Sequence, residues 1–304
     1  MNNASAKNSP AFYRFIARRA LKGHWLTALQ IALIVSLLPM LVRGIFSYTS
    51  GGLNTDLNSI YNAMLSGTVD YQPVEQFFQK YSSRLYLFAG LEVAAFLIIP
   101  CLSLGMNKWS MDRLRGLEGP VTTVFCRVRL FFRACGLEIL VALKILLWTL
   151  PGIALNVLVY FVFVRLSSSF PEMLSVSTYL MVYVYLLLPS VVVPAFLAYL
   201  RYALAEFVLA DKPETKITDC IRRSKSLLQG NKRLLVLNVL FFLLLEFVSS
   251  LFSGLPGVLY YMVVLLYSLV ISVYWCGTLS AIYLSLEHES IKEQEPEPAP
   301  DELN

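Results

Sequence analysis

The fold is decided in residues 202–247, where the chain reads "YALAEFVLADKPETKITDCIRRSKSLLQGNKRLLVLNVLFFLLLEF". A basic segment separates two apolar runs there, and each run approaches the roughly twenty residues that a helix needs to cross a bilayer. Within the basic segment, apolar and small residues recur at helical spacing, at Ile217, Cys220, Ile221, Ser224, Leu227 and Leu228. The pattern predicts a short amphipathic helix on the membrane surface between two membrane-spanning helices.

Turn-forming residues give the expected ends of this surface helix. Asp211 can cap its first turn, and Glu214 follows three residues later, as in a capping box. Pro213 between them suits the first turn of a helix. Gly230 is well placed to end the helix, because glycine tolerates the left-handed backbone that closes many helices. We therefore expect the helix between Asp211 and Gly230.

The composition places the whole chain in a membrane. Of its 304 residues, 57% are hydrophobic and 15% are charged, and the mean hydropathy is +0.63. Soluble domains carry about 25% charged residues. Apolar stretches long enough to span a bilayer occur at residues 25–46, 85–106, 137–164, 179–205, 234–252 and 258–286. The sequence predicts an all-α, polytopic membrane helical bundle with six transmembrane helices, kinked at Pro151, Pro189 and Pro194.

Two further segments resemble the surface helix described above. Residues 9–23, "SPAFYRFIARRALKG", precede the first span, and residues 119–136, "GPVTTVFCRVRLFFRACG", precede the third. Both begin near a proline, carry apolar residues on one side and end at a glycine. We expect three amphipathic elbow helices, each followed by a transmembrane hairpin. The alternative is that proline, glycine and arginine simply collect at membrane boundaries.

The distribution of positive charge predicts the orientation. Lys and Arg gather in residues 7–22, 108–133 and 212–233, whereas the intervening loops contain few of them. Because loops rich in Lys and Arg stay in the cytoplasm, we expect a multi-pass protein of the cell membrane with both termini cytoplasmic. The elbow helices then lie on the cytoplasmic side.

The opening stretch also resembles a known family. Its matching positions are Tyr202, Ala210, Asp211, Pro213, Ser224, Lys225, Leu227 and Gly230. A second segment, "LLWTLPGI" at residues 146–153, is similar to another part of the same family. The family is a group of bacterial integral-membrane proteins catalogued as domain of unknown function 975. The resemblance implies a membrane fold and a compartment, and it implies no activity.

The sequence contains no recognisable catalytic motif. His24 stands at a membrane edge and His288 near the C-terminus, which leaves no histidine-rich metal centre within the membrane. The five cysteines form no CxxC pair, and glycine-rich phosphate loops and GxSxG elbows are missing. We expect a protein that is not an enzyme, with no metal, no cofactor and no nucleic-acid partner.

Four charged residues inside or near the spans form a candidate intramembrane polar site: Arg43, Glu92, Lys144 and Glu246. A charge in the bilayer costs a few kcal/mol, so each should find a partner or a wet cavity. A functional interpretation is a polar cavity that binds an ion or a headgroup. A structural interpretation is that Arg43 neutralises Glu92 or Glu246 and holds the bundle together.

Two regions lie outside the spans. Residues 47–84 form an outer loop, in which residues 56–67 and 73–81 have helical apolar spacing. These helices could rest on the outer leaflet or meet a protein partner. Residues 1–286 then make a single membrane domain, and the acidic, proline-bearing residues 287–304 make a disordered cytoplasmic tail.

These features predict a membrane component that binds lipids or organises partner proteins. The basic elbow helices would contact the anionic inner leaflet, through Arg18, Arg19, Arg127, Arg129, Arg222 and Arg223. The alternative is a transporter or lipid-translocating protein that uses the intramembrane Glu and Lys residues.

Overall fold

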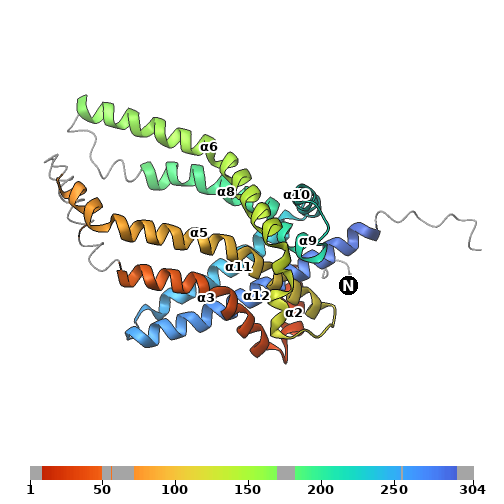
Figure 1. Cartoon of the computed structure of the whole chain (residues 1–304). Coiled ribbons are helices and arrows are strands. Elements are labelled where there is room, and N and C mark those ends of the chain that lie inside the picture. Colours follow the sequence, from red (N-terminus) through yellow and green to blue (C-terminus); the bar gives the residue numbers. More distant parts are fainter. Residues whose placement is uncertain (1–8, 50–55, 57–71, 170–181, 255, 293–304) are drawn as a thin grey trace, which may run out of the picture.

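The computed structural model describes residues 9–49, 56, 72–169, 182–254 and 256–292, and these residues form helices joined by short turns (Figure 1). The α-helices are α2 (Pro10–Leu21), α3 (Trp25–Thr49), α5 (Gln72–Leu114), α6 (Phe131–Ser169), α8 (Leu188–Tyr202), α9 (Ala205–Asp211), α10 (Ile217–Leu227), α11 (Lys232–Ser249) and α12 (Gly257–Lys292). Three further helical segments are η1 (Val121–Leu130), the π turn η2 (Tyr183–Leu187) and η3 (Ser250–Gly254).

The six expected membrane spans are confirmed. Six helical stretches are long and apolar enough to cross a bilayer, namely Trp25–Val42, Glu75–Leu114, Val121–Phe163, Tyr183–Asp211, Lys232–Phe252 and Leu259–Ile291. Most of their side chains are not buried inside the bundle, as expected for helices that face lipid. The protein is therefore a multi-pass helical membrane protein.

A short helix precedes each of α3, α6 and α11, as expected for the elbow helices. The first of them, α2, begins as predicted, because Phe12 N donates a hydrogen bond of 3.3 Å to the Ser9 side chain and Pro10 occupies the first turn. Glycines with positive φ, Gly23 at 85° and Gly230 at 92°, turn the chain from α2 into α3 and from α10 into α11.

The predicted start of the elbow helix before α11 is wrong. Asp211 ends α9, and α10 begins at Ile217 without a side-chain cap. The carboxylate of Asp211 is bound by Arg115 instead, which prevents it from capping the helix that follows. The Asp-x-Pro-Glu pattern therefore marks a turn between two helices and not a capping box.

The second elbow also differs from its prediction. Its segment η1 is a 3-10 helix that leads directly into α6 at Phe131, so Gly136 lies inside α6 and ends no helix. A Cβ atom at Gly136 would lie 2.9 Å from Cδ1 of Ile217, which shows that this glycine lets α10 approach α6. A second glycine has the same role where η1 contacts α5. A Cβ atom at Gly105 of α5 would lie 1.9 Å from the Val124 carbonyl oxygen of η1.

The helices α6 and α8 form a close pair. A Cβ atom at Gly152 would lie 2.2 Å from the Ser190 carbonyl oxygen, and Asn156 Nδ2 donates 3.2 Å hydrogen bonds to Leu187 O and Ser190 Oγ. The π turn η2 ends directly before α8, where Pro189 lacks an amide hydrogen. The α6–α8 pair leans away from α3, α5, α11 and α12 toward one end of the bundle (Figure 1).

The core lies toward the opposite end, where the short helices gather (Figure 1). A cluster of buried residues there joins α2, α5, α9, α10 and α12, and its largest fully buried side chains include Tyr13, Leu204, Leu209 and Tyr283. A second cluster packs Ile31 and its neighbours on α3 against α5, η1 and α12. The short helices are thus part of the packed core and not appendages.

Two predictions about the ends of helices are corrected. Residues 73–81 are the beginning of the continuous helix α5, because no glycine or proline interrupts the chain between Pro73 and Gly90. The first helix expected in the outer loop falls outside the described residues, except for Asp56. At the other end of the chain, α12 continues to Lys292, because Glu287 is bound by cations of the preceding helices. Residues 293–304 of the predicted tail are not among the described residues.

We predict that Gly105→Ala destabilises the protein, because the new methyl group would collide with the backbone of η1. Such overpacking costs about 1–3 kcal/mol. The matched control is Gly90→Ala on the same helix, where no atom lies within 4 Å of the new methyl group. Helix propensity should make that control neutral or slightly stabilising. The measurement is the temperature at which half of the detergent-solubilised protein aggregates, and equal values for both variants would contradict the packing described.

Candidate functional site

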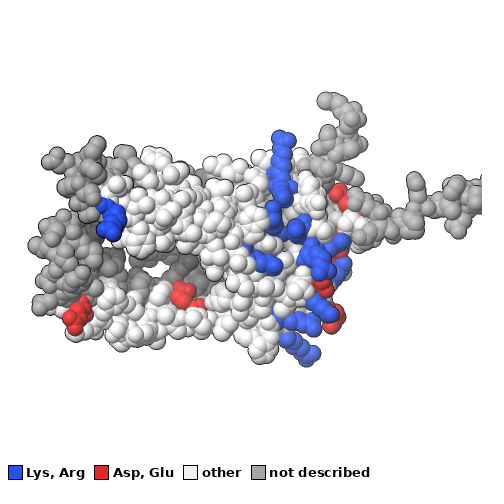
Figure 2. All heavy atoms as spheres, turned by 90° about the horizontal axis from the view of Figure 1, so that it is seen from above, with Lys and Arg blue, Asp and Glu red and all other residues white. Residues whose placement is uncertain are grey.

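Positive charge gathers at one end of the bundle. Figure 2 shows most Lys and Arg side chains in a cluster at this end, together with several acidic ones. We call it the basic end, formed by α2, η1, α10 and the adjoining ends of α5, α9 and α12. The first and last described helices also reach it (Figure 1). The segments that the sequence shows to be basic thus lie on the same side, an arrangement that the positive-inside rule requires of them.

A carboxylate at the end of α9 links three helices at the basic end. Asp211 accepts hydrogen bonds of 2.7 and 3.0 Å from the two terminal nitrogens of Arg115, which follows α5. It also accepts a 3.2 Å bond from the Tyr283 hydroxyl of α12. The hydrogen bonds between Arg115 and Asp211 raise the pKa of the Arg115 guanidinium, because the carboxylate stabilises its positive charge. The fork geometry fixes the angle between α5 and α9.

A second carboxylate, Glu287 of α12, is 6% exposed and holds two cations. Its two oxygens lie 2.5 Å from Lys212 Nζ and 3.1 Å from Arg223 Nε. Arg223 also donates to the Ser290 hydroxyl. Glu287 thereby binds the α9–α10 turn and α10 to the end of α12. We refer to Asp211 and Glu287 as the anchor carboxylates.

Two arginines beside the anchors bind backbone carbonyls near the end of α9. Arg127 of η1 donates a 2.7 Å hydrogen bond to the Ala210 carbonyl oxygen. Arg133 of α6 donates to the carbonyl oxygen of Pro213. Cations stabilise the C-terminal carbonyls of a helix, so both arginines help to place α9 against η1 and α6.

The six arginines predicted to contact lipid therefore divide into two groups. The structure leaves four of them exposed, at Arg18, Arg19, Arg129 and Arg222. Of these, Arg222 lies 3.4 Å from Asp219 on its own helix, an exposed pair of small energetic value. The remaining two, Arg127 and Arg223, are partly buried and bound to protein groups.

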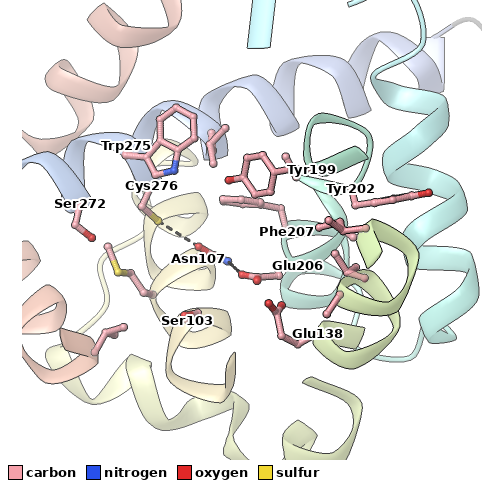
Figure 3. A pocket seen from close by; sticks show the side chains of 18 residues that line it. Ser103, Asn107, Glu138, Tyr199, Tyr202, Glu206, Phe207, Ser272, Trp275 and Cys276 are labelled. Atoms are coloured by element: carbon pink, nitrogen blue, oxygen red, sulfur yellow. Dashed lines mark hydrogen bonds between the residues drawn. The ribbon is translucent and has the colours of Figure 1, made fainter. Parts of the chain in front are cut away.

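A cavity of about 310 Å³ lies beneath the basic end, between α5, α6, α8, α9 and α12. The carboxyl groups of Glu138 on α6 and Glu206 on α9 point toward one another in it (Figure 3). Asn107 of α5 donates a 3.2 Å hydrogen bond to Glu206, and its carbonyl oxygen lies 3.3 Å from the Cys276 sulfur. The aromatic wall includes Trp275 of α12.

Paired carboxyl groups in such a place have a definite chemistry. Two carboxylates close together in a region of low dielectric repel each other, so they share a proton or bind a cation. Groups of three or more His, Cys, Asp and Glu side chains able to hold a metal ion do not occur within the described part of the chain. The cavity is therefore suited to a proton, or to a cation that aromatic rings also stabilise.

The predicted intramembrane residues lie apart from this pair. Glu92 is exposed on α5, and Lys144 is partly buried on α6. Glu246 of α11 is exposed and lines a neighbouring hollow of about 340 Å³, which shares Tyr199 and Trp275 with the cavity. The structure does not describe the side chain of Arg43, so its predicted role as a partner of the acids remains a prediction.

Glu92, Lys144 and Glu246 are not joined to one another by ion pairs. Among the described side chains, none of Glu92, Lys144 and Glu246 forms a salt bridge within 4.0 Å. Their assignment as a polar site is thus still a prediction from the sequence.

Sequence reasoning missed the acids that line the cavity. Glu138 lies at the very start of the third expected span, residues 137–164, and it faces inward. Glu206 is the one acidic residue in residues 183–210, and a lone carboxyl among apolar residues is a signal that could have identified it. Nothing in the sequence indicated that the two would meet, because they lie on different helices.

The fold and the cavity define a class, a six-span helical membrane protein with a packed basic end. The chain belongs to the family described as protein of unknown function (DUF975), whose sequence model matches residues 12–290. This confirms the resemblance found in the sequence, over nearly the whole chain. No curated protein and no solved structure is significantly similar to the chain.

We predict that Glu287→Gln lowers stability, because it leaves Lys212 and Arg223 without their common partner. Breaking a buried ion pair costs about 3–5 kcal/mol. The loss here should lie near the lower limit, since the Lys212 side chain is 53% exposed. The measurement is thermal unfolding in detergent, with Glu289→Gln as the control of equal charge on the exposed side of the same helix. A control that is destabilised as strongly would show that the anchor has no special role.

Proposed function

We propose that the protein is a non-enzymatic membrane component whose basic end binds anionic lipid of the inner leaflet and which organises partner proteins. The observation that carries this proposal is the set of exposed arginines on the interfacial helices, Arg18 and Arg19 on α2 and Arg129 on η1. The basic end then faces the cytoplasm, with both termini on that side of the cell membrane.

The way in which acids are used at the basic end supports this proposal. Asp112, Asp211 and Glu287 are all engaged by cations of neighbouring segments or of the same helix. Their negative charge is therefore not available to the exposed arginines. Each uncompensated cation near an anionic bilayer surface contributes about 1 kcal/mol to binding. A few such residues on neighbouring helices suffice to concentrate anionic lipid around the protein.

The organising role rests on the sequence of the outer segment. Residues 47–84 carry apolar helical patterns, and the described part includes the start of α5, where Lys80 and Tyr81 bind Asp56 at 2.6 and 2.9 Å. We therefore propose that a partner protein contacts residues 47–84. The proposal includes no catalytic step, no cofactor and no nucleic acid.

A second candidate function is transport, and the cavity supports it. The Glu138–Glu206 pair can take up and release a proton or a cation, which is the chemistry of many coupled transporters. Figure 2 shows the surface hollowed between two ridges in the part of the bundle away from the basic end. Glu246 lines a separate hollow that shares side chains with the cavity.

Mass spectrometry of the intact protein released from native membrane discs tests the first candidate. We predict that anionic phospholipids remain bound and are enriched over their share of the surrounding bilayer, because the exposed arginines attract them. A recurrent protein partner in the same spectra would support the organising role. Retention of lipids in the same proportions as in the bulk bilayer, without a partner, would contradict the proposal.

Proteoliposomes with an internal pH-sensitive dye test the second candidate. An imposed sodium or potassium gradient should drive proton movement through the wild-type protein, and Glu206→Gln should abolish it by removing one proton-binding group. The matched control is Glu92→Gln, because Glu92 is exposed on the bundle surface outside the cavity. Transport through the cavity is contradicted if wild-type flux equals that of empty vesicles, or if both variants retain it.

A further inference from the structure

The helix α2 is fixed in rotation by its contacts with α12. The Tyr13 hydroxyl lies 3.3 Å from the Ser285 side-chain oxygen, and Tyr13 is fully buried. One turn later, the methyl group of Ala17 lies 3.4 Å from the position that a Cβ atom would take at Gly277. This packing sets the direction of the neighbouring side chains of α2, among them Arg14 and Arg18.

Arg14 is held in place by two neutral groups of α11. Its terminal nitrogen donates a 3.0 Å hydrogen bond to Oδ1 of Asn238, and its guanidinium carbon lies 4.1 Å from the ring centre of Phe241. The Asn238 side chain is fully buried, and its own nitrogen donates a 2.9 Å bond to Leu234 O. The amide oxygen therefore points at Arg14. These two contacts orient the guanidinium, and neither of them carries a charge that would neutralise it.

Arg18, one turn after Arg14 on α2, also lies over an aromatic ring. Its guanidinium carbon lies 5.8 Å from the ring centre of Tyr274 on α12, and the side chain is exposed. Aromatic rings orient guanidinium groups without removing their charge. Within the described part of the chain, no carboxylate oxygen lies within 4.0 Å of Arg14 or Arg18. Two oriented cations thus stand four residues apart with no acid between them.

A groove of about 310 Å³ lies between the start of α2 and the start of α11, and its α2 residue, Pro10, is one helical turn before Arg14. Its wall includes Pro10 of α2, with Arg233, Leu234 and Leu237 of α11. It adds a third cation and an apolar surface. Further along α11, the side chains of Leu240 and Leu244 are 48% and 68% exposed, so an apolar face continues from the groove into the membrane-spanning part of the helix.

We infer that Arg14 and Arg18 bind the phosphate of one anionic phospholipid, whose acyl chains lie along the exposed face of α11. Guanidinium groups bind phosphate oxygens through paired, charge-assisted hydrogen bonds. The apolar face beside the site favours a lipid over a soluble phosphate. An anionic headgroup is favoured over a zwitterionic one, because no carboxylate of the described residues lies within 4.0 Å of either guanidinium or lines the groove. The inference deepens the proposed lipid-binding function and rests on it.

The test compares two double variants of equal charge. Arg14→Gln with Arg18→Gln removes the site, and Lys22→Gln with Lys216→Gln removes two exposed lysines outside it. Each protein is titrated with phosphatidylglycerol in phosphatidylcholine nanodiscs, and bound lipid is counted by native mass spectrometry. We expect the first variant to lose one tightly bound phosphatidylglycerol, with about a tenfold weaker apparent affinity, and the control to keep it.

The outcomes separate the site from the general proposal. Equal losses in both variants would overturn the inference and leave lipid binding by diffuse charge. A wild-type protein without any preference for phosphatidylglycerol would overturn the proposed function itself. Displacement of the lipid by glycerol phosphate at equal concentration would assign the site to soluble phosphates and overturn the lipid assignment.

A folding control keeps the test decisive. Arg18→Gln alone changes an exposed side chain that forms no hydrogen bond with Asn238 or with either anchor carboxylate, so the variant should fold like the wild type. It should still weaken phosphatidylglycerol binding several-fold while its unfolding temperature stays unchanged. Unaltered binding in this folded variant would also overturn the inference.

Discussion

The anchor carboxylates are the interactions on which both functional regions depend. Asp211 fixes α9 against α5 through Arg115, and the same short helix carries Glu206 into the cavity. Glu287 fixes the end of α12 through Lys212 and Arg223. Since α12 also supplies Trp275 to the cavity and the surface on which α2 packs, its position decides the geometry of the cavity and of the arginines on α2.

The charges of the protein are sorted by depth. At the basic end, the largely buried acids Asp211 and Glu287 meet cations whose side chains are 27–53% exposed, and these pairs link segments far apart in the sequence. Farther out, Arg18 and Arg19 on α2 and Arg129 on η1 are exposed and form no salt bridge with the described side chains, so we propose that they meet the charge of the bilayer. Within the bundle, Glu138 and Glu206 point toward each other, and neither forms a salt bridge with a described cation. The ion pairs of the anchors hold the fold together, and the other two sets of charges are the ones that we propose bind ligands.

Sequence patterns predicted the parts of the fold that depend on local chemistry. Apolar length located the six spans, and Ser9-Pro10 marked the start of α2. The errors concern contacts between distant segments. Asp211 has the sequence context of a helix cap, but Arg115, 96 positions earlier, binds it instead. Gly136 has the context of a helix end, but it makes room for Ile217. The cavity was missed because Glu138 and Glu206 meet only in the folded bundle.

The central claim is that anionic lipid binds at one defined place on the basic end. Photo-crosslinking of headgroup-labelled phosphatidylglycerol in vesicles, followed by peptide mapping, tests it most directly. The account predicts crosslinks in two segments. One is residues 10–22, which contain α2, and the other is residues 230–244, which contain the first part of α11. Crosslinks spread evenly over all the membrane-facing helices, or concentrated at the end away from α2, would contradict it.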